Sequence, residues 1–507
     1  MSKRSATEVV SEGQAFAKAS SSGAKREPVS ENLEFEDAWE DEIESDEEVV
    51  DAEAAEREDG MDVDEVMPAI EESEEQPSSA SNVFIPGIHT LQEGEVLEAD
   101  DSVYLMRHTL GVDWPCLSFD ILRDNLGDER QRFPATAYLV AGTQADTAKN
   151  NEVRVYKMSN LHRTQKDGDN SDSENEEEDD DDDLDEDPIL EHRSIPHLGG
   201  VNRIRAQPLP PASPLPPVSQ SYHVASWAET GKVHIWNVRP HIESLESPGY
   251  TFDKTQANKP VFTINSHGRS EGFAMDWASS GTSALRLLTG DIASKIYLTT
   301  STVSGFNTLS QPFTSHTSSI EDLQWSPSEP TVFASCSADR TIQIWDVRSK
   351  GRQSVAGVDP AHDSDVNVIS WNKITSYLLL SGGDEGGIKV WDLRNVQKRG
   401  TSSPTPTPIA SFNWHKAPIT SVEWHPTDAS TFVASGADDQ VTLWDLAVEQ
   451  DDDEMNESSG DVEVPPQLLF FHPGQKDIKE AHWHPQIPGA VVSTALTGFD
   501  VFKTISA

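Results

Sequence analysis

The stretch HTSSIEDLQWSPSEPTVFASCSADRTIQIWD, residues 316–346, decides how this chain folds. It returns as residues 362–392 and again as residues 415–445. Each copy begins with His and ends with Trp-Asp, and an internal Asp lies 22 or 23 residues after the His. Between these points, short runs alternate apolar and polar residues. This alternation predicts β-strands that are buried on at least one face.

A repeat of about 40–45 residues with this signature is typical of WD-repeat propellers, in which each unit builds one four-stranded blade. In such proteins the His, the Asp, a strand Ser and the Trp form a buried hydrogen-bonded chain. Because the set recurs in every clear copy, we interpret it as structural and not as a metal site or a catalytic triad. The residues expected in this chain are His316, Asp339 and Trp345, then His362, Asp384 and Trp391, then His415, Asp438 and Trp444.

Weaker copies of the repeat flank the clear ones. Units beginning at His197 and His267 precede them, and a unit beginning at His472 follows. Once apparent inserts are set aside, residues 112–507 divide into seven units of about 44 residues. The sequence therefore predicts an all-β fold, a seven-bladed WD40 β-propeller. We place it over 117–507, with an acidic loop at 158–192, a Pro-rich loop at 207–219 and an acidic Pro-Pro loop at 447–466.

The segment ahead of the repeats, residues 83–116, is predicted to contain an N-terminal helix. Either Asp of the pair at 100–101 can cap that helix, and Val103 and Leu110 then fall on one helical face. Residues 117–122 are predicted to form a strand. We expect this strand to close the ring as the outermost strand of the last blade, because closure hides sheet edges.

The negative charge of the chain is concentrated in three stretches. The net charge is −50, and 44 of the 88 acidic residues lie in 31–76, 170–187 and 449–463. A low content of aromatic residues there predicts disordered acidic extensions, including all of 1–82. Such a chain repels phosphate, so we expect no direct binding of nucleic acid and a strongly basic protein as its partner.

Other classes of protein are disfavoured by what the sequence lacks. Two separate cysteines, Cys116 and Cys336, fit neither a disulfide framework nor a zinc site. No apolar run is long enough to span a membrane. We find no phosphate-binding loop and no ligand cluster, so we expect no cofactor, no metal and no enzymatic activity. Ser171 and Ser173, each with an acid three residues on, are candidate phosphorylation sites.

The motif WPCLSFD at 114–120, ahead of seven WD units, resembles the histone-binding WD-repeat proteins of the chromatin-assembly type. The acidic insert 449–463, followed by Pro465 and Pro466, strengthens the resemblance. In that family an acidic loop ending in Pro-Pro and the N-terminal helix form a groove for a histone helix. Within the family, the long acidic N-terminus and the acidic loop after blade one are most similar to the glutamate-rich WD-repeat proteins.

This resemblance implies a chaperone for a newly made basic protein of the large ribosomal subunit, the universal third one. The chaperone would deliver this client to nucleolar pre-60S particles. It would be a monomer in the nucleus and nucleolus, and also in the cytoplasm where the client is captured. Histones are the alternative client. We expect the client groove to be formed by Tyr104, Leu468 and Phe470, with an acidic rim of Asp452, Asp453, Glu454, Asp461 and Glu463.

A different reading is a substrate receptor of a cullin ubiquitin ligase. The motif Trp-Asp-x-Arg occurs at residues 345–348 and 391–394 and resembles motifs that dock to the ligase adaptor. The same Asp and Arg can equally well finish a strand, as in many WD-repeat proteins. The sequence leaves this alternative open.

Overall fold

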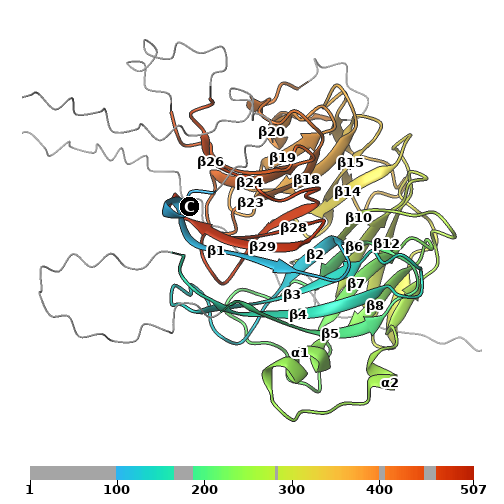
Figure 1. Ribbon diagram of the computed structural model, residues 1–507. Coiled ribbons are helices and arrows are strands. Elements are labelled where there is room, and N and C mark those ends of the chain that lie inside the picture. Colours follow the sequence, from blue (N-terminus) through green and yellow to red (C-terminus); the bar gives the residue numbers. More distant parts are fainter. Residues whose placement is uncertain (1–98, 165–186, 280–283, 399–405, 450–463, 507) are drawn as a thin grey trace, which may run out of the picture. The chain divides into compact units, whose positions relative to one another are not determined.

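The computed structural model describes residues 99–164, 187–279, 284–398, 406–449 and 464–506. These residues form a β-propeller of seven sheets, which we number as blades one to seven (Figure 1). Within each blade, consecutive strands pair antiparallel. The seven-bladed WD40 propeller predicted from the sequence is confirmed.

The first three blades follow one another along the chain. Blade one contains β2 (Cys116–Leu122), β3 (Ala135–Thr143), β4 (Glu152–Leu161) and β5 (Ile189–Pro196). Blade two contains β6 (Val201–Ala206), β7 (His223–Ala228), β8 (Val233–Asn237) and β9 (Phe262–Ile264). Blade three contains β10 (Ala274–Trp277), β11 (Arg286–Gly290), β12 (Ile296–Thr302) and β13 (Gly305–Thr308).

The next three blades hold the clear sequence repeats. Blade four contains β14 (Ile320–Trp325), β15 (Val332–Ser337), β16 (Ile342–Asp346) and β17 (Ala356–Val358), with β21 (Gln397–Lys398) added at its edge. Blade five contains β18 (Val366–Trp371), β19 (Leu378–Gly383), β20 (Ile388–Asp392) and β22 (Ala410–Phe412). Blade six contains β23 (Ile419–Trp424), β24 (Thr431–Gly436), β25 (Gln440–Asp445) and β26 (Leu468–His472).

Blade seven joins the two ends of the described chain. Its strands β27 (Glu480–Trp483), β28 (Ala490–Ala495) and β29 (Gly498–Thr504) come last in the sequence. Its outermost strand is β1 (Tyr104–Gly111), which pairs antiparallel with β29. The ring is therefore closed by the segment that precedes blade one.

Two predictions about this segment are wrong. The predicted helix is only a 3-10 turn, η1 (Asp101–Val103), capped by the Asp100 side chain and followed directly by β1. The predicted closing strand, β2, is instead the innermost strand of blade one. The physical reason is the free edge of β29, whose N–H and C=O groups need a partner strand.

Few helical segments interrupt the strands. The insert of blade two holds α1 (Arg239–Glu246) and α2 (Lys254–Ala257), and a 3-10 turn, η3 (Leu393–Asn395), follows β20. The apolar core is divided into seven clusters, and each cluster fills the joint between two neighbouring blades. Burial of both faces of the sheets explains why strands such as β24 and β28 have no exposed position.

Candidate functional site

The outer rim where blades six and seven meet holds the apolar residues predicted for a client groove. Leu468 and Phe470 lie on β26 and are half-buried. Phe470 meets the Tyr104 ring edge-on, with centroids 5.3 Å apart. Leu468 packs separately, against the cluster between blades five and six. The structure thus brings two of the three residues together.

Tyr104 itself is part of the core and presents no surface to a client. Its side chain is 2% exposed, and its hydroxyl lies 2.7 Å from Nδ1 of His472. The carboxylate of Asp500 lies 3.1 Å from Nε2 of the same histidine and can only accept a hydrogen bond. Nε2 of neutral His472 therefore carries the proton, and Nδ1 accepts from Tyr104. The predicted role of Tyr104 as a direct contact is withdrawn.

Both acidic inserts leave the fold beside this rim. The Thr164 N–H, at the start of the insert in blade one, donates to the Leu105 carbonyl of β1 at 3.1 Å. The Gln467 side chain donates to the Val448 carbonyl at 3.0 Å, which joins the two ends of the insert in blade six. The predicted rim residues Asp452, Asp453, Glu454, Asp461 and Glu463 lie outside the described residues, as do Ser171 and Ser173.

The hydrogen-bonded chain of the WD repeats is present in blade four as the motif predicts. His316 Nδ1 lies 2.8 Å from Asp339, and its Nε2 lies 2.7 Å from the Ser335 hydroxyl. The Trp345 indole N–H donates to the same hydroxyl at 2.8 Å. In blade six the middle position differs, because His415 and Trp444 both meet the Thr442 hydroxyl. His415 there also contacts Asp438, at 2.9 Å.

Blade five corrects one predicted residue of this chain. His362 Nδ1 meets Glu385, at 2.5 Å, and not Asp384. His362 Nε2 and Trp391 both reach the Ser381 hydroxyl. The longer glutamate side chain reaches the histidine from one position further along the turn. Asp384 is left exposed at the surface.

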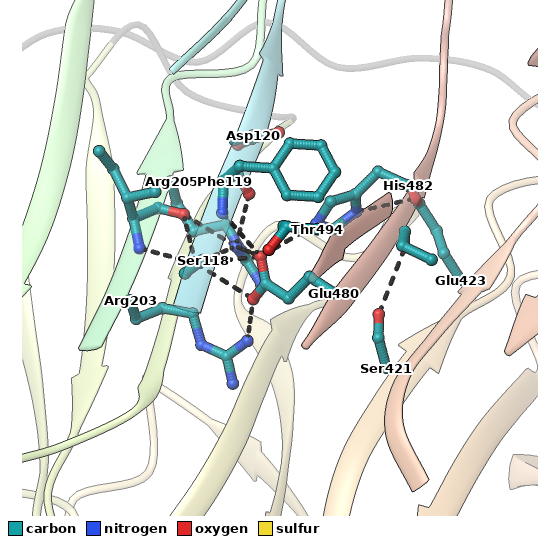
Figure 2. A network of polar contacts seen from close by, with 12 residues as sticks. Ser118, Phe119, Asp120, Arg203, Arg205, Ser421, Glu423, Glu480, His482 and Thr494 are labelled. Carbon is teal, nitrogen blue, oxygen red and sulfur yellow. Dashed lines mark hydrogen bonds and ion pairs between the residues drawn. The ribbon is translucent and has the colours of Figure 1, made fainter. Parts of the chain in front are cut away.

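A buried charged network on the innermost strands was missed in the sequence (Figure 2). At its centre, the Glu480 carboxylate of β27 accepts from the Phe119 N–H of β2 at 2.9 Å and from the Ser118 hydroxyl. It also forms ion pairs with Arg203 and Arg205 of β6. One carboxylate therefore ties together blades seven, one and two.

His482 extends this network to blade six. Its Nδ1 lies 3.0 Å from Glu423 and its Nε2 lies 3.4 Å from Glu480. Burial lowers the pKa of His482, but the two carboxylates outweigh it and raise this pKa to about 9. Burial likewise opposes ionisation of Glu480, yet Arg205 and Arg203 hold its pKa well below the ordinary value. Both groups are therefore charged at neutral pH.

The network belongs to a pattern that runs around the ring. The innermost strand of each blade is a sheet edge with unpaired backbone groups. A side chain of one blade accepts a backbone N–H of the innermost strand of the next blade. The accepting residues are Ser118, Asp120, Asp276, Asp322, Gln324, Ser370, Glu423 and Glu480. Between blades two and three, Arg203 instead donates to the Phe273 carbonyl.

A sequence signal for this network exists. Charged residues stand at alternate positions of strands that are otherwise apolar, such as Arg203 and Arg205, or Glu480 and His482. Residues at alternate positions share one face of a strand. Seven innermost strands with polar residues on the same face therefore indicate a lined central channel. The signal was hidden because each strand taken alone resembles an ordinary half-buried strand.

The two Trp-Asp-x-Arg motifs present their arginines to solvent. The side chains of Arg348 and Arg394 are 69% and 62% exposed. Each guanidinium forms paired contacts with the Asp two residues before it, Asp346 or Asp392. Arg394 also lies over the Tyr377 ring, 3.7 Å from its centroid. The motif thus does finish a strand, and it also leaves a fixed, exposed guanidinium.

Within the described ranges, no group of three or more His, Cys, Asp or Glu is arranged to hold a metal ion. None of the helices in the described part of the chain combines the length and the apolar run needed to cross a bilayer. Cys116 and Cys336 are both buried and unpaired.

Known proteins resemble both parts of this architecture. A family model for the histone-binding protein RBBP4, which is also described as a component of the CAF1 complex, matches residues 94–162. The model of the WD domain, G-beta repeat, matches 307–346, 354–392 and 406–445.

Three curated relatives cover most or all of the chain. Ribosome assembly protein rrb1 of Schizosaccharomyces pombe is 48% identical over 513 residues, which is 100% of both chains. Protein HEAT STRESS TOLERANT DWD 1 of Arabidopsis thaliana is 45% identical and covers 85% of this chain and 92% of its own. Glutamate-rich WD repeat-containing protein 1 of Dictyostelium discoideum is 43% identical and covers 83% and 84%. The chain therefore belongs to the glutamate-rich WD-repeat proteins, the family that includes the fission-yeast ribosome assembly protein rrb1.

Proposed function

We propose that this protein acts in ribosome assembly as a dedicated chaperone of a newly made basic protein of the large subunit, the universal third one. It binds this client, keeps it soluble and delivers it to nucleolar pre-60S particles. The name of the fission-yeast relative, which is similar over its whole length, supports the assembly role. The concentration of acidic residues in three stretches supports a strongly basic client.

One observation carries the proposal: both acidic inserts leave the fold beside β1 and β26. Leu468 and Phe470 lie half-buried on β26 between them. Acidic segments raise the rate at which a basic protein arrives, by about 10- to 1000-fold at low salt. Exposed ion pairs contribute little selectivity, so apolar contacts with β26 must select the client.

A binding assay with the full chain and the purified ribosomal protein tests this. In Phe470→Ala we expect binding to weaken mainly through faster dissociation. Neutralising Asp452, Asp453 and Glu454 to Asn and Gln should mainly slow association, and only at low salt. A Val303→Ala variant, which changes an exposed side chain far along the ring in blade three, serves as the control. Unchanged affinity in Phe470→Ala would contradict the role of β26.

Histones are the second candidate client. The match of residues 94–162 to a family model described as histone-binding favours them. Both clients are basic, so the acidic segments attract either one. Competition between the ribosomal protein and a histone H3–H4 complex for the full chain at moderate salt separates the two. If the histone displaces the ribosomal protein at equal concentration, the histone is the preferred client.

The two exposed arginines favour a third candidate, docking to a cullin ligase adaptor. Arg348 and Arg394 are held in the same orientation at equivalent strand ends of neighbouring blades. Replacing both with Ala should abolish co-purification of the adaptor while leaving client binding intact. If the adaptor still co-purifies with the double variant, the motif only finishes the strands.

A further inference from the structure

The buried chain of blade seven is wired differently from that of the other blades. In blade four, the His, Ser and Trp of the chain lie within one sequence repeat, residues 316–345. In blade seven, the histidine is His472, the last residue of β26 in blade six. Its partners are Asp500 on β29 and Tyr104 on β1. We call Tyr104, His472 and Asp500 the closure seam.

The closure seam joins three strands that are far apart in the sequence. Tyr104 and His472 are separated by 368 positions, and their contact is buried. The His472 ring also stacks on Phe502 of β29, with centroids 4.2 Å apart. One side chain of blade six is therefore in contact with both strands whose pairing closes the ring. The chain of blade four, by contrast, serves a single blade.

The closure seam lies directly under the apolar residues of β26. Phe470 precedes His472 by two positions and meets the Tyr104 ring edge-on. Tyr104 and Phe470 belong to the same apolar cluster as Phe502, which pairs across to Arg107 of β1. Any partner that covers Phe470 also restricts the Tyr104 ring, because cores are packed too tightly for one ring to move alone.

We propose that Tyr104 couples ring closure to the client groove on β26: an occupied groove strengthens the pairing of β1 with β29, and a closed seam holds Phe470 in its binding position. Tyr104 is thus a positioning residue that does not touch the client. This inference rests on the proposed function only for the identity of the client. The link between Tyr104 and ring closure stands apart from it.

Hydrogen exchange of the full chain without any client tests the first half. Tyr104→Phe keeps the ring and removes only the hydroxyl, leaving Nδ1 of His472 without a partner. We expect amides of β1 and β29 to exchange about tenfold faster, and amides of blade four to be unchanged. The matched control is Trp345→Phe, which removes the N–H donor of the chain in blade four. It should have the opposite pattern, and identical patterns in both variants would overturn the inference.

Adding the purified basic ribosomal protein tests the second half. In the wild type, we expect the client to slow exchange in β1 and β29 more than in blade four. In Tyr104→Phe, its affinity should fall several-fold, whereas Trp345→Phe should bind like the wild type. If the wild type binds the client but Tyr104→Phe binds equally well, the coupling is wrong and the proposed function stands. If the wild type does not bind, the proposed function fails, and the result without client still decides the role of Tyr104.

Discussion

Glu480 shows how much one side chain does at the residue scale. It bonds to blade one, pairs with two arginines of blade two and is almost fully buried, with 2% of its side chain exposed. Removing one partner of a buried ion pair is costly, because the remaining charges have lost their hydration and gain nothing in return. Glu480 is therefore the residue whose replacement should matter most for the joint between blades seven and one.

We expect Glu480→Gln to lower the free energy of unfolding by about 3 kcal/mol, because Arg203 and Arg205 lose their buried counter-charge. Urea titration followed by tryptophan fluorescence measures this. Asp346→Asn removes an exposed ion pair and is the control, with a change too small to separate from the wild type. Equal effects of the two substitutions would contradict the central role of Glu480.

His482 gives the stability of the protein a specific dependence on pH. Its folded pKa is raised to about 9, whereas an unfolded histidine titrates near 6.5. The stabilisation is therefore fully present below about pH 6.5 and is lost as pH rises through about 9. We expect the free energy of unfolding to fall by on the order of 3 kcal/mol over this interval. In His482→Gln, urea titrations at a series of pH values should give a flatter profile.

Turns and strand edges decide the outcome at the scale of elements. In blade five, the turn after β19 places Glu385 where the clear repeats place Asp339 and Asp438. The sequence spacing alone allowed either Asp384 or Glu385, because both lie within reach of one turn. The structure distinguishes them by contact, since only Glu385 meets His362.

This pair of neighbours provides its own control. Glu385→Ala leaves buried Nδ1 of His362 without its acceptor, and we expect a loss of about 1–2 kcal/mol in the free energy of unfolding. Asp384→Ala removes an exposed carboxylate from the same turn and should change stability little. Thermal and urea unfolding of both variants measures the difference. A greater loss in Asp384→Ala would show that the turn is arranged differently.

The elements that the sequence predicted well are those with a repeated signature. Blades four to six follow from their His and Trp-Asp positions, and the apolar alternation locates their strands. The segment 104–111 was misjudged because its apolar residues fit both periods. Val103 and Leu110 fit a helix, but buried Tyr104, Met106 and Leu110 fit a strand equally well. The free edge of β29 decides between them, and no local pattern contains that information.

At the scale of the whole molecule, charge and apolar contact are separated along the chain. Outside three acidic stretches, the remaining charge is only about −7. The client site was predicted in part: β26 carries Leu468 and Phe470 as expected, but Tyr104 proved to be core. The sequence could not separate a surface aromatic residue from a buried one because both stand in mixed polar surroundings.

We expect this separation to appear in binding kinetics. Deleting residues 450–463 should slow association of the ribosomal protein about tenfold at low salt and leave dissociation nearly unchanged. At high salt the deletion and the wild type should bind at similar rates, because the attraction is screened beyond about 3 Å at 1 M. Stopped-flow measurements over a range of salt concentrations test this. A change confined to dissociation would place the acidic insert in direct contact with the client.

The pairing of β1 with β29 also sets an order of events during synthesis. Gly111 pairs with Gly498, so the strand made first meets its partner only when the last blade has been made. At about 5–20 residues per second, the ribosome needs tens of seconds to make the chain between them. Throughout this interval β1 waits as a lone strand, exposed to other nascent chains. A circular permutant that begins at Cys116 and carries β1 after β29 would remove the delay, and we expect it to mature faster and aggregate less.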